Sequence, residues 1–167
     1  MNTDGASDII RTLREKYNGR MLIGAGTVTD MPRLQTAIEA GAQFIVTPNI
    51  HDDVIRWCIA HDVLITPGAL TPTEMCHAMA LGCKYVKLFP SEPFGPAYLK
   101  AVRGPLSDVD ILVVGGVNST NFADYLKVGA FGAGVGGNLC KMRSLSDAEA
   151  ITKEALTLTS LRKEYLS

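Results

Sequence analysis

Lys87 has the clearest chemical potential in the chain, because it interrupts an apolar run from Tyr85 to Phe89 that otherwise reads as a buried strand. A buried ammonium group is costly, so it either pairs with a carboxylate or loses its proton. A lysine with a lowered pKa can attack a ketone and form an imine. The alternative is a lysine whose ammonium reaches solvent, as we expect for Lys84 at the start of the same run.

Two glycine pairs suit the binding of a phosphate group. Gly115-Gly116 and Gly136-Gly137 each follow a predicted strand, and bare backbone N–H groups can approach an anion closely there. A tight turn explains a single pair equally well. Two such pairs on successive strands make an anion site as good an interpretation as a turn.

Other polar or rigid residues also follow predicted strands or begin predicted helices. Thr27 can donate its hydroxyl to a substrate carboxylate, although a turn or helix-cap role is as good an interpretation. Pro48 is expected to shape a rigid loop, and Glu92 is expected to be a loop residue rather than a catalytic base. We interpret His51 and Glu74 as helix-capping residues.

The cysteines and histidines predict neither a metal site nor a cofactor. The 4 cysteines form no C-x-x-C pair and lie among apolar residues, which predicts buried free thiols in a reducing cytosol. The 3 histidines show no ligand spacing with cysteine or carboxylate. The residues concerned are Cys58, Cys76, Cys83, Cys140, His51, His61 and His77.

Short apolar runs that alternate with helical segments are expected to position these residues. The runs are too short for helices and read as strands buried on both faces of a parallel sheet. They are Met21–Ala25, Phe44–Thr47, Val63–Thr66, Tyr85–Phe89, Ile111–Val114 and Phe131–Val135. The predicted helices are Ser7–Tyr17, Asp30–Ala40, Asp52–Ala60, Thr73–Leu81, Pro96–Val102, Asn121–Val128 and Ser146–Tyr165.

A repeated joint supports this strand-helix pattern. Gly41, Gly82 and Gly129 each end a predicted helix just before a strand, where glycine can take the left-handed conformation. Strand-helix units in series predict an open doubly wound sheet or part of a (β/α)8 barrel. In both, ligands bind beyond the carboxyl ends of the strands, where the lysine, threonine and glycines lie.

Composition is that of an ordinary globular protein. The chain has 167 residues, of which 47% are hydrophobic and 20% charged, with a formal net charge of −1. We expect a single domain over residues 1–167, with neither a nucleic acid nor a membrane as partner. No apolar run has the length of a membrane span or of a signal peptide, which predicts a cytoplasmic location.

Four ordered motifs give the chain a specific resemblance to the 2-keto-3-deoxy-6-phosphogluconate (KDPG) aldolase family. They are Gly24–Val28, Thr47–His51, Lys87–Ser91 and Gly115–Val117. Thr47–His51 and Phe94-Gly95-Pro96 are most similar to the 6-phosphogalactonate (KDPGal) variant. The resemblance implies a (β/α)8 barrel of the class I aldolase type, usually a homotrimer that needs no metal. The reaction it implies is reversible cleavage of a 2-keto-3-deoxy-6-phospho sugar acid to pyruvate and glyceraldehyde 3-phosphate.

The resemblance also implies a role for each matched residue. Lys87 forms the imine, Thr27 holds the pyruvyl carboxylate and Pro48 lines the pocket. The phosphate is bound by Gly115, Gly116, Gly136 and Gly137. Val114 stands where gluconate-type members resembling this chain carry threonine. Because a missing polar partner can discriminate epimers, we expect preference for the galactonate substrate.

Two departures from the family pattern bear on activity. Gly137 stands where similar chains often have serine, so one phosphate hydrogen bond is missing. By the resemblance, Met1 aligns just after the second strand of the family barrel, which leaves six β/α units. The family's proton-shuttling glutamate and a carboxylate-binding basic residue would lie upstream of Met1. General acid-base assistance is worth about 10² to 10⁴ in rate. Because the break falls at a methionine inside an otherwise intact pattern, we expect a longer protein that begins upstream, with a natural remnant as the alternative.

Two further functions remain open. A catalytically impaired homologue would bind phosphosugars, or act in assembly, without turnover. An open-sheet nucleotide binder would use Gly24-Ala25-Gly26 as its phosphate loop, but residue 29 is Thr, so the full G-x-G-x-x-G motif is absent.

Overall fold

The computed structural model describes residues 1–137, 139 and 147–165. The loop residue Asn138, the fourth cysteine Cys140 and Ser146, where the last helix was expected to begin, lie outside the described residues. The chain divides into two compact units, Met1–Val86 and Lys87–Ser167, which are described separately below. The single domain over residues 1–167 stays a prediction.

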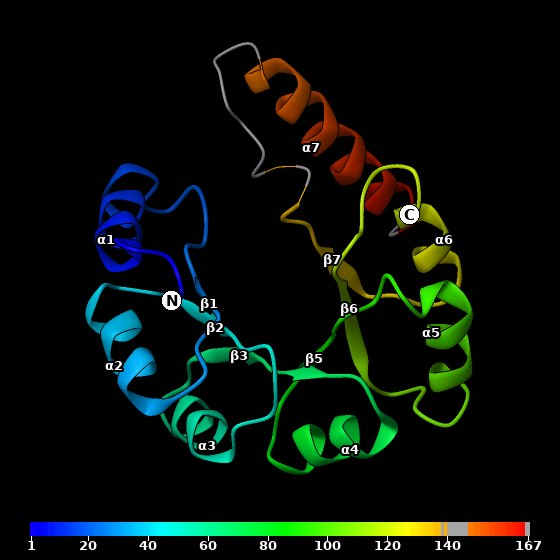
Figure 1. The fold of residues 1–167 in the computed structure, drawn as a ribbon, viewed down its shortest axis with the longest axis horizontal. Coiled ribbons are helices and arrows are strands. Elements are labelled where there is room, and N and C mark those ends of the chain that lie inside the picture. Colours follow the sequence, from blue (N-terminus) through cyan, green and yellow to red (C-terminus); the bar gives the residue numbers. More distant parts are fainter. Residues whose placement is uncertain (138, 140–146, 166–167) are drawn as a thin grey trace. The chain divides into compact units, whose positions relative to one another are not determined.

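The first unit alternates helices with short parallel strands (Figure 1). Strands β1, β2 and β3 form a parallel sheet in that order, with Ala25 opposite Ile45 and Phe44 opposite Leu64. Their carboxyl ends therefore meet at one edge of this sheet. The elements are α1 (Ala6–Lys16), β1 (Ala25–Gly26), α2 (Met31–Glu39), β2 (Phe44–Val46), α3 (Asp52–Ala60), β3 (Leu64–Thr66), β4 (Gly68–Ala69) and α4 (Pro72–Ala80).

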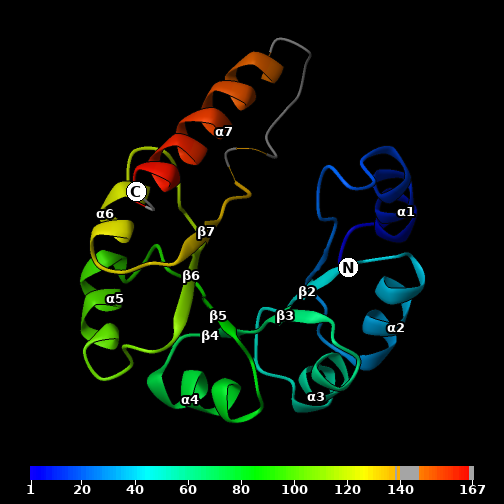
Figure 2. The same ribbon diagram turned by 180° about the vertical axis from the view of Figure 1, so that it is seen from behind.

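The second unit continues the same alternation, with strand order β5-β6-β7 (Figure 2). β6 and β7 are parallel, with Val114 opposite Gly134 at their carboxyl ends. The last helix lies beside α6 and is tied to the loop after β6 by Ser119, whose Oγ donates to Glu154 at 2.6 Å. The elements are β5 (Tyr85–Leu88), α5 (Gly95–Arg103), β6 (Asp110–Val114), α6 (Phe122–Lys127), β7 (Gly132–Gly134) and α7 (Asp147–Glu164).

Fully buried aliphatic side chains form the core of each unit. Ile45 on β2, Ile55 on α3 and Met75 on α4 have no exposed surface in the first unit. Leu99 on α5 and Ile111 on β6 are equally buried in the second. Each such side chain contributes about 1.5–3 kcal/mol through removal of apolar surface from water. These contacts hold the helices against the strands whose ends carry the polar residues.

Helix starts in the first unit follow their sequence signals. The Asp30 carboxylate accepts a hydrogen bond from the Arg33 N–H at 2.8 Å, which makes Asp30 the N-cap of α2. Thr71 and Glu74 form a capping box at the start of α4. Backbone hydrogen bonds from Thr71 and Leu70 lower the pKa of the Glu74 carboxyl. The predicted capping role of Glu74 is therefore confirmed, whereas the N-cap residue His51 makes no side-chain cap bond.

The glycine joints take the predicted left-handed conformation. The φ angles of Gly41, Gly82 and Gly129 are 89°, 96° and 95°. The next amide after each glycine bonds back to the preceding helix, as when the Ala42 N–H donates to Ala37. Each joint therefore ends one helix and sends the chain into the next strand.

The main errors of the strand prediction concern β1 and β4. The strand expected at Met21–Ala25 is observed at Ala25–Gly26, and the Met21 and Leu22 side chains are 56% and 66% exposed. Instead, the Gln43 N–H donates to the Ile23 carbonyl, and the Ile23 N–H donates to the side-chain oxygen of Gln43. The two residues of β4 were not predicted, because Gly-Ala carries no strand pattern.

Of the three described cysteines, two match the prediction of buried free thiols. Burial raises the pKa of Cys58 to about 12 and that of Cys83 to about 11. Cys76 is free but exposed, so the prediction was wrong for this residue. It lies on the outer face of α4, where a small residue in an apolar stretch can still point to water. No helix among the described residues is long and apolar enough to span a bilayer.

Candidate active site

Lys87 is a buried cation on β5. Its side chain is only 9% exposed, and its neighbours in the strand, Val86 and Leu88, are completely buried. The Lys87 Nζ lies 4.2 Å from the centroid of the Phe89 ring. Burial lowers the pKa of the Lys87 ammonium, and no carboxylate contributes to the shift. A neutral amine in this position is a good nucleophile for a carbonyl carbon.

A glycine-walled cavity of about 450 Å³ lies at the carboxyl ends of β5, β6 and β7. Phe89 lines this cavity, and the Lys87 ammonium lies over the Phe89 ring in a cation–π contact. The lysine is therefore next to the cavity wall. The Val114 side chain packs against Gly134, where an added Cβ would lie 2.9 Å from Cγ2 of the valine. The lining residues are Phe89, Glu92, Val114, Gly115, Gly116, Val117, Asn118, Gly134, Gly136 and Gly137.

The first glycine pair is held in an unusual conformation by hydrogen bonds. Gly115 and Gly116 have φ angles of 101° and 71°, which side chains rarely adopt. The Ser91 hydroxyl donates to the Gly115 carbonyl at 2.9 Å, and the Asn118 and Asn121 side chains donate to the Gly116 carbonyl at 3.1 and 3.0 Å. Both carbonyls of the pair therefore already accept hydrogen bonds. Within the described residues, the Gly116 N–H donates to no protein acceptor and suits an anion.

The second glycine pair borders open space. A Cβ added at Gly136 or Gly137 would meet no atom within 4 Å, and neither residue has a positive φ. These glycines are thus required neither by close packing nor by a left-handed turn. An open backbone segment of this kind allows a bulky anion to approach.

Thr27 is one of two non-glycine residues of the first unit with a left-handed backbone, and Asp62 is the other. Thr27 follows β1 with a φ of 57°, an uncommon conformation for a β-branched residue and one that often marks a functional position. Asp30 caps α2, so the helix-cap interpretation of Thr27 does not hold. Within the described residues, no hydrogen bond of the Thr27 hydroxyl occurs, so the group is free to bind a ligand.

Pro48 lies in a tightly packed loop after β2. An added Cβ at Gly68 would lie 2.3 Å from the Pro48 carbonyl carbon, so only glycine fits against this loop. The buried Thr47 hydroxyl donates to the Asn49 carbonyl at 2.5 Å and accepts from the Gly68 N–H at 3.4 Å. The loop is therefore closely packed and hydrogen-bonded, and its rigid shaping by Pro48 stays a prediction.

The predicted site residues fall into two groups, one in each unit. The second unit brings Val114 and the four glycines together around one cavity, with Lys87 beside it. Thr27 and Pro48 both lie at the strand-end edge of the sheet in the first unit. Glu92 lies in a loop, as predicted, and it also lines the cavity, which the sequence reasoning did not predict.

The histidines have separate surroundings. His77 contacts Asp52 at 2.8 Å, and His61 stacks on Trp57 with ring centroids 3.9 Å apart. The buried Nδ1 of His51 has no hydrogen-bond partner. Within the described part of the chain, no three His, Cys, Asp or Glu side chains gather as a metal site would require.

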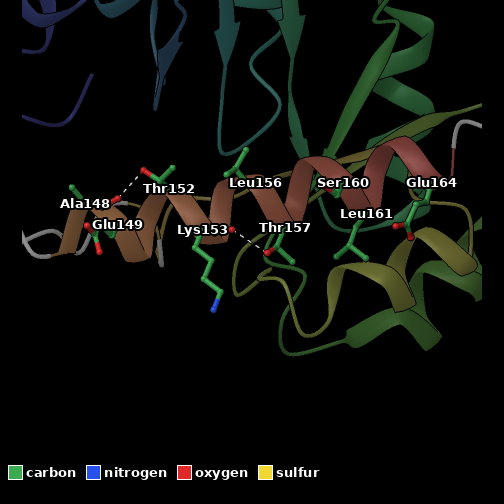
Figure 3. Close-up of a pocket in the computed structure, with 9 residues that line it drawn as sticks. All are labelled: Ala148, Glu149, Thr152, Lys153, Leu156, Thr157, Ser160, Leu161 and Glu164. Carbon is green, nitrogen blue, oxygen red and sulfur yellow. Dashed lines mark hydrogen bonds between the residues drawn. The ribbon is translucent and has the colours of Figure 1, made fainter.

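A second hollow of about 700 Å³ lies along α7 (Figure 3). Although it is larger, every lining residue comes from this one helix, and none was predicted to act in chemistry. The Thr152 and Thr157 hydroxyls bond back to the carbonyls of Ala148 and Lys153, as the dashed lines show. The polar groups of the hollow along α7 do not converge. The glycine-walled cavity is therefore the better candidate site.

Comparison with known proteins gives sequence relatives of one kind. The 2-dehydro-3-deoxy-6-phosphogalactonate aldolase of Escherichia coli (strain K12) is 35% identical over 165 residues, covering 98% of this chain and 80% of that protein. The 2-dehydro-3-deoxy-phosphogluconate aldolase of Pseudomonas aeruginosa is 42% identical over 120 residues, covering 71% of this chain and 54% of that protein. The chain thus spans most of the first relative and about half of the second.

Solved structures and a family model agree with these relatives. A native KDPGal structure aligns with a TM-score of 0.89 at 35% identity, covering 99% of this chain and 80% of that one. A 4-hydroxy-2-oxoglutarate/2-dehydro-3-deoxyphosphogluconate aldolase aligns with a TM-score of 0.85 at 31% identity, covering 97% and 78%. This confirms the α/β fold of the aldolase barrel type, whereas the predicted N-terminal truncation stays a prediction. The family model for KDPG and KHG aldolase matches residues 1–154, and the chain belongs to this family.

Proposed function

We propose that this protein is a class I aldolase that cleaves 2-keto-3-deoxy-6-phosphogalactonate, or its gluconate epimer, to pyruvate and D-glyceraldehyde 3-phosphate. One observation carries the proposal. The Lys87 amine is buried, has a lowered pKa and rests on Phe89, a wall residue of the glycine-walled cavity. Family membership supports the same reaction, because the relatives named above are aldolases of this substrate class.

Lys87 begins the proposed reaction by attacking the C2 ketone. Loss of water gives an imine, whose protonated form withdraws electrons from the C3–C4 bond. The C4 hydroxyl loses its proton as that bond breaks, so glyceraldehyde 3-phosphate leaves and an enamine remains on the lysine. Protonation of the enamine at C3 and addition of water release pyruvate and restore the amine. Burial of Lys87 keeps a fraction of the amine neutral, which the first step requires.

The remaining site residues bind the two ends of the substrate in this proposal. Thr27 donates its free hydroxyl to the pyruvyl carboxylate, and Pro48 forms part of the pocket wall. The phosphate lies against the backbone of the two glycine pairs, Gly115-Gly116 and Gly136-Gly137. The engaged carbonyls of the first pair support this assignment, because they leave N–H groups to face the anion.

Borohydride reduction in the presence of pyruvate tests the lysine directly. Borohydride converts an imine to a stable secondary amine, so mass spectrometry of peptides should find one reduced pyruvyl group on Lys87. Lys87→Met should abolish labelling. Lys84→Met is the matched control, because Lys84 is an exposed lysine next to the same strand, and its loss should leave labelling unchanged. Labelling that persists in Lys87→Met would disprove the assignment.

The alternative function is phosphosugar binding or assembly without turnover. Calorimetry with the phosphorylated sugar acid, run beside the borohydride experiment, separates the two functions. Binding together with labelling and product formation supports the aldolase. Binding without labelling supports the non-catalytic homologue.

Val114 is proposed to set the epimer preference. Its side chain lines the cavity beside Gly134 and offers no hydrogen bond to the C4 hydroxyl. We expect the galactonate substrate to be cleaved in preference to the gluconate substrate. Val114→Thr should move the ratio of kcat/KM toward gluconate by about tenfold, since one hydrogen bond contributes roughly 0.5–1.5 kcal/mol. Preferential gluconate cleavage by the unchanged protein would contradict this role.

We also propose that the protein is a homotrimer and acts in the cytoplasm without a cofactor. A structural relative of 35% identity is a cage designed by fusing symmetric oligomeric domains, which supports self-association. The free thiols of Cys58, Cys76 and Cys83 fit a reducing compartment. Sedimentation equilibrium should give three times the mass of one chain.

A further inference from the structure

Glu92 is the one charged residue among the described residues that line the glycine-walled cavity. Its side chain lies against the backbone of Gly116. A Cβ built on this glycine would be 2.5 Å from the carboxyl carbon of Glu92 and 2.6 Å from its Cβ. A carboxylate therefore borders the loop to which the phosphate is assigned.

The position of the Glu92 Cβ is set by the backbone. The preceding residue, Ser91, is completely buried, and its N–H donates to the Val114 carbonyl at 2.9 Å. Its hydroxyl donates to the Gly115 carbonyl at 2.9 Å, and its carbonyl accepts from the Tyr125 hydroxyl at 3.1 Å. Because Ser91 is held on three sides, the Cβ of Glu92 stays beside Gly116.

A carboxylate in this place has opposite effects on two kinds of ligand. It repels a phosphate dianion, and no cationic side chain among the described lining residues offsets that repulsion. It also accepts hydrogen bonds, and bonds from hydroxyl groups to a carboxylate are short and strong. A ligand that carries hydroxyls beside its phosphate thus regains, through hydrogen bonds, the binding free energy that the repulsion removes. Inorganic phosphate has no such hydroxyls on a carbon chain and does not regain it.

We propose that Glu92 is a specificity-determining residue that accepts a hydrogen bond from a hydroxyl on the substrate's carbon chain and excludes simple phosphate. This inference rests on the proposed function, because it requires a phosphorylated polyhydroxy acid in the cavity. Inorganic phosphate, which would otherwise compete at the same loop, is thereby disfavoured.

Calorimetry of Glu92→Gln tests the proposal without relying on turnover. Glutamine keeps the size of the side chain and removes its charge. All titrations use a Lys87→Met background, so that the sugar acid is not cleaved. We expect inorganic phosphate to bind about tenfold more tightly to Glu92→Gln, and the phosphorylated sugar acid to bind about tenfold more weakly. Asp108→Asn is the matched control, because it makes the same charge change in the second unit outside the cavity lining, and it should change neither affinity.

Unchanged phosphate affinity in Glu92→Gln would overturn the proposal, and so would an equal gain for both ligands. The proposed aldolase function is judged separately, by the labelling of Lys87 in the unchanged protein. If Lys87 of the unchanged protein is not labelled, but Glu92→Gln shifts the affinities for inorganic phosphate and for the sugar acid in opposite directions, the aldolase reaction is rejected and the role of Glu92 is kept.

Discussion

Two buried polar residues near the carboxyl ends of strands, Thr47 just after β2 and Lys87 within β5, have different surroundings. The Thr47 hydroxyl is fully buried and bonds to both Asn49 and Gly68. The Lys87 ammonium is almost as buried and lies over the face of the Phe89 ring, and within the described residues it makes no hydrogen bond or ion pair. A buried polar group whose bonds are made within the protein stabilises the fold, whereas one left with an aromatic face is available to a ligand.

Replacement of the two residues should therefore have opposite consequences, and the largest effect is expected for Lys87→Met. This variant should lose all detectable cleavage while its melting temperature stays equal or rises, because the cost of burying an ammonium disappears. A coupled assay for pyruvate and differential scanning calorimetry measure the two properties. A large fall in melting temperature would show that Lys87 is a structural residue and remove the contrast.

Thr47→Val should show the reverse pattern. Valine fills the same space but leaves the Asn49 carbonyl and the Gly68 N–H without their partner. We expect the free energy of unfolding to fall by about 1–3 kcal/mol, as is typical for buried polar groups left unsatisfied. Urea titration measures this loss. Pyruvate labelling of Lys87 should persist in Thr47→Val at temperatures where the variant is folded. Absence of labelling there would contradict a purely structural role of Thr47.

The pH dependence of stability sharpens the comparison. Burial lowers the pKa of Lys87 from its ordinary value of 10.5, so between the two values the unfolded chain binds more protons than the folded chain. The stability of the unchanged protein should therefore rise with pH across that window, relative to Lys87→Met. Urea titrations at a series of pH values measure the difference. Parallel curves for the two proteins would mean that Lys87 keeps its proton in the fold.

The smallest expected effect is a gain at the phosphate end. Gly137→Ser places a hydroxyl where an added Cβ meets no atom within 4 Å, so the side chain fits without strain. One further hydrogen bond to phosphate should lower KM for the phosphorylated substrate about 2- to 10-fold. Steady-state kinetics measure the change, with kcat expected to stay the same. An increase in KM would indicate that the substrate phosphate does not bind beside residue 137.

Much of the fold was predictable because its signals are local. Hydrophobic periodicity and caps such as Asp30 mark the helices, and glycine marks the turns back into the sheet. The exposed Met21 and Leu22 misled the prediction of β1, because apolar composition does not reveal whether a residue has neighbours.

The candidate site was predictable only in part, for a similar reason. Lys87 is conspicuous because a charge interrupts an apolar strand. Glu92 is not conspicuous in the sequence. Its place in the cavity depends on hydrogen bonds from Ser91 to Val114 and Gly115, which are distant from it in the sequence. The positive φ of Gly116 and of Thr27 likewise arises from tertiary structure.

The three left-handed glycine joints have a consequence for engineering. Gly41, Gly82 and Gly129 have nearly the same φ angle, and the residue after each bonds back to the preceding helix. We expect segments cut at these positions to be exchangeable. Chimeras that exchange segments between homologous aldolases at these boundaries should keep their chain direction, which makes the joints natural crossover points for recombination libraries.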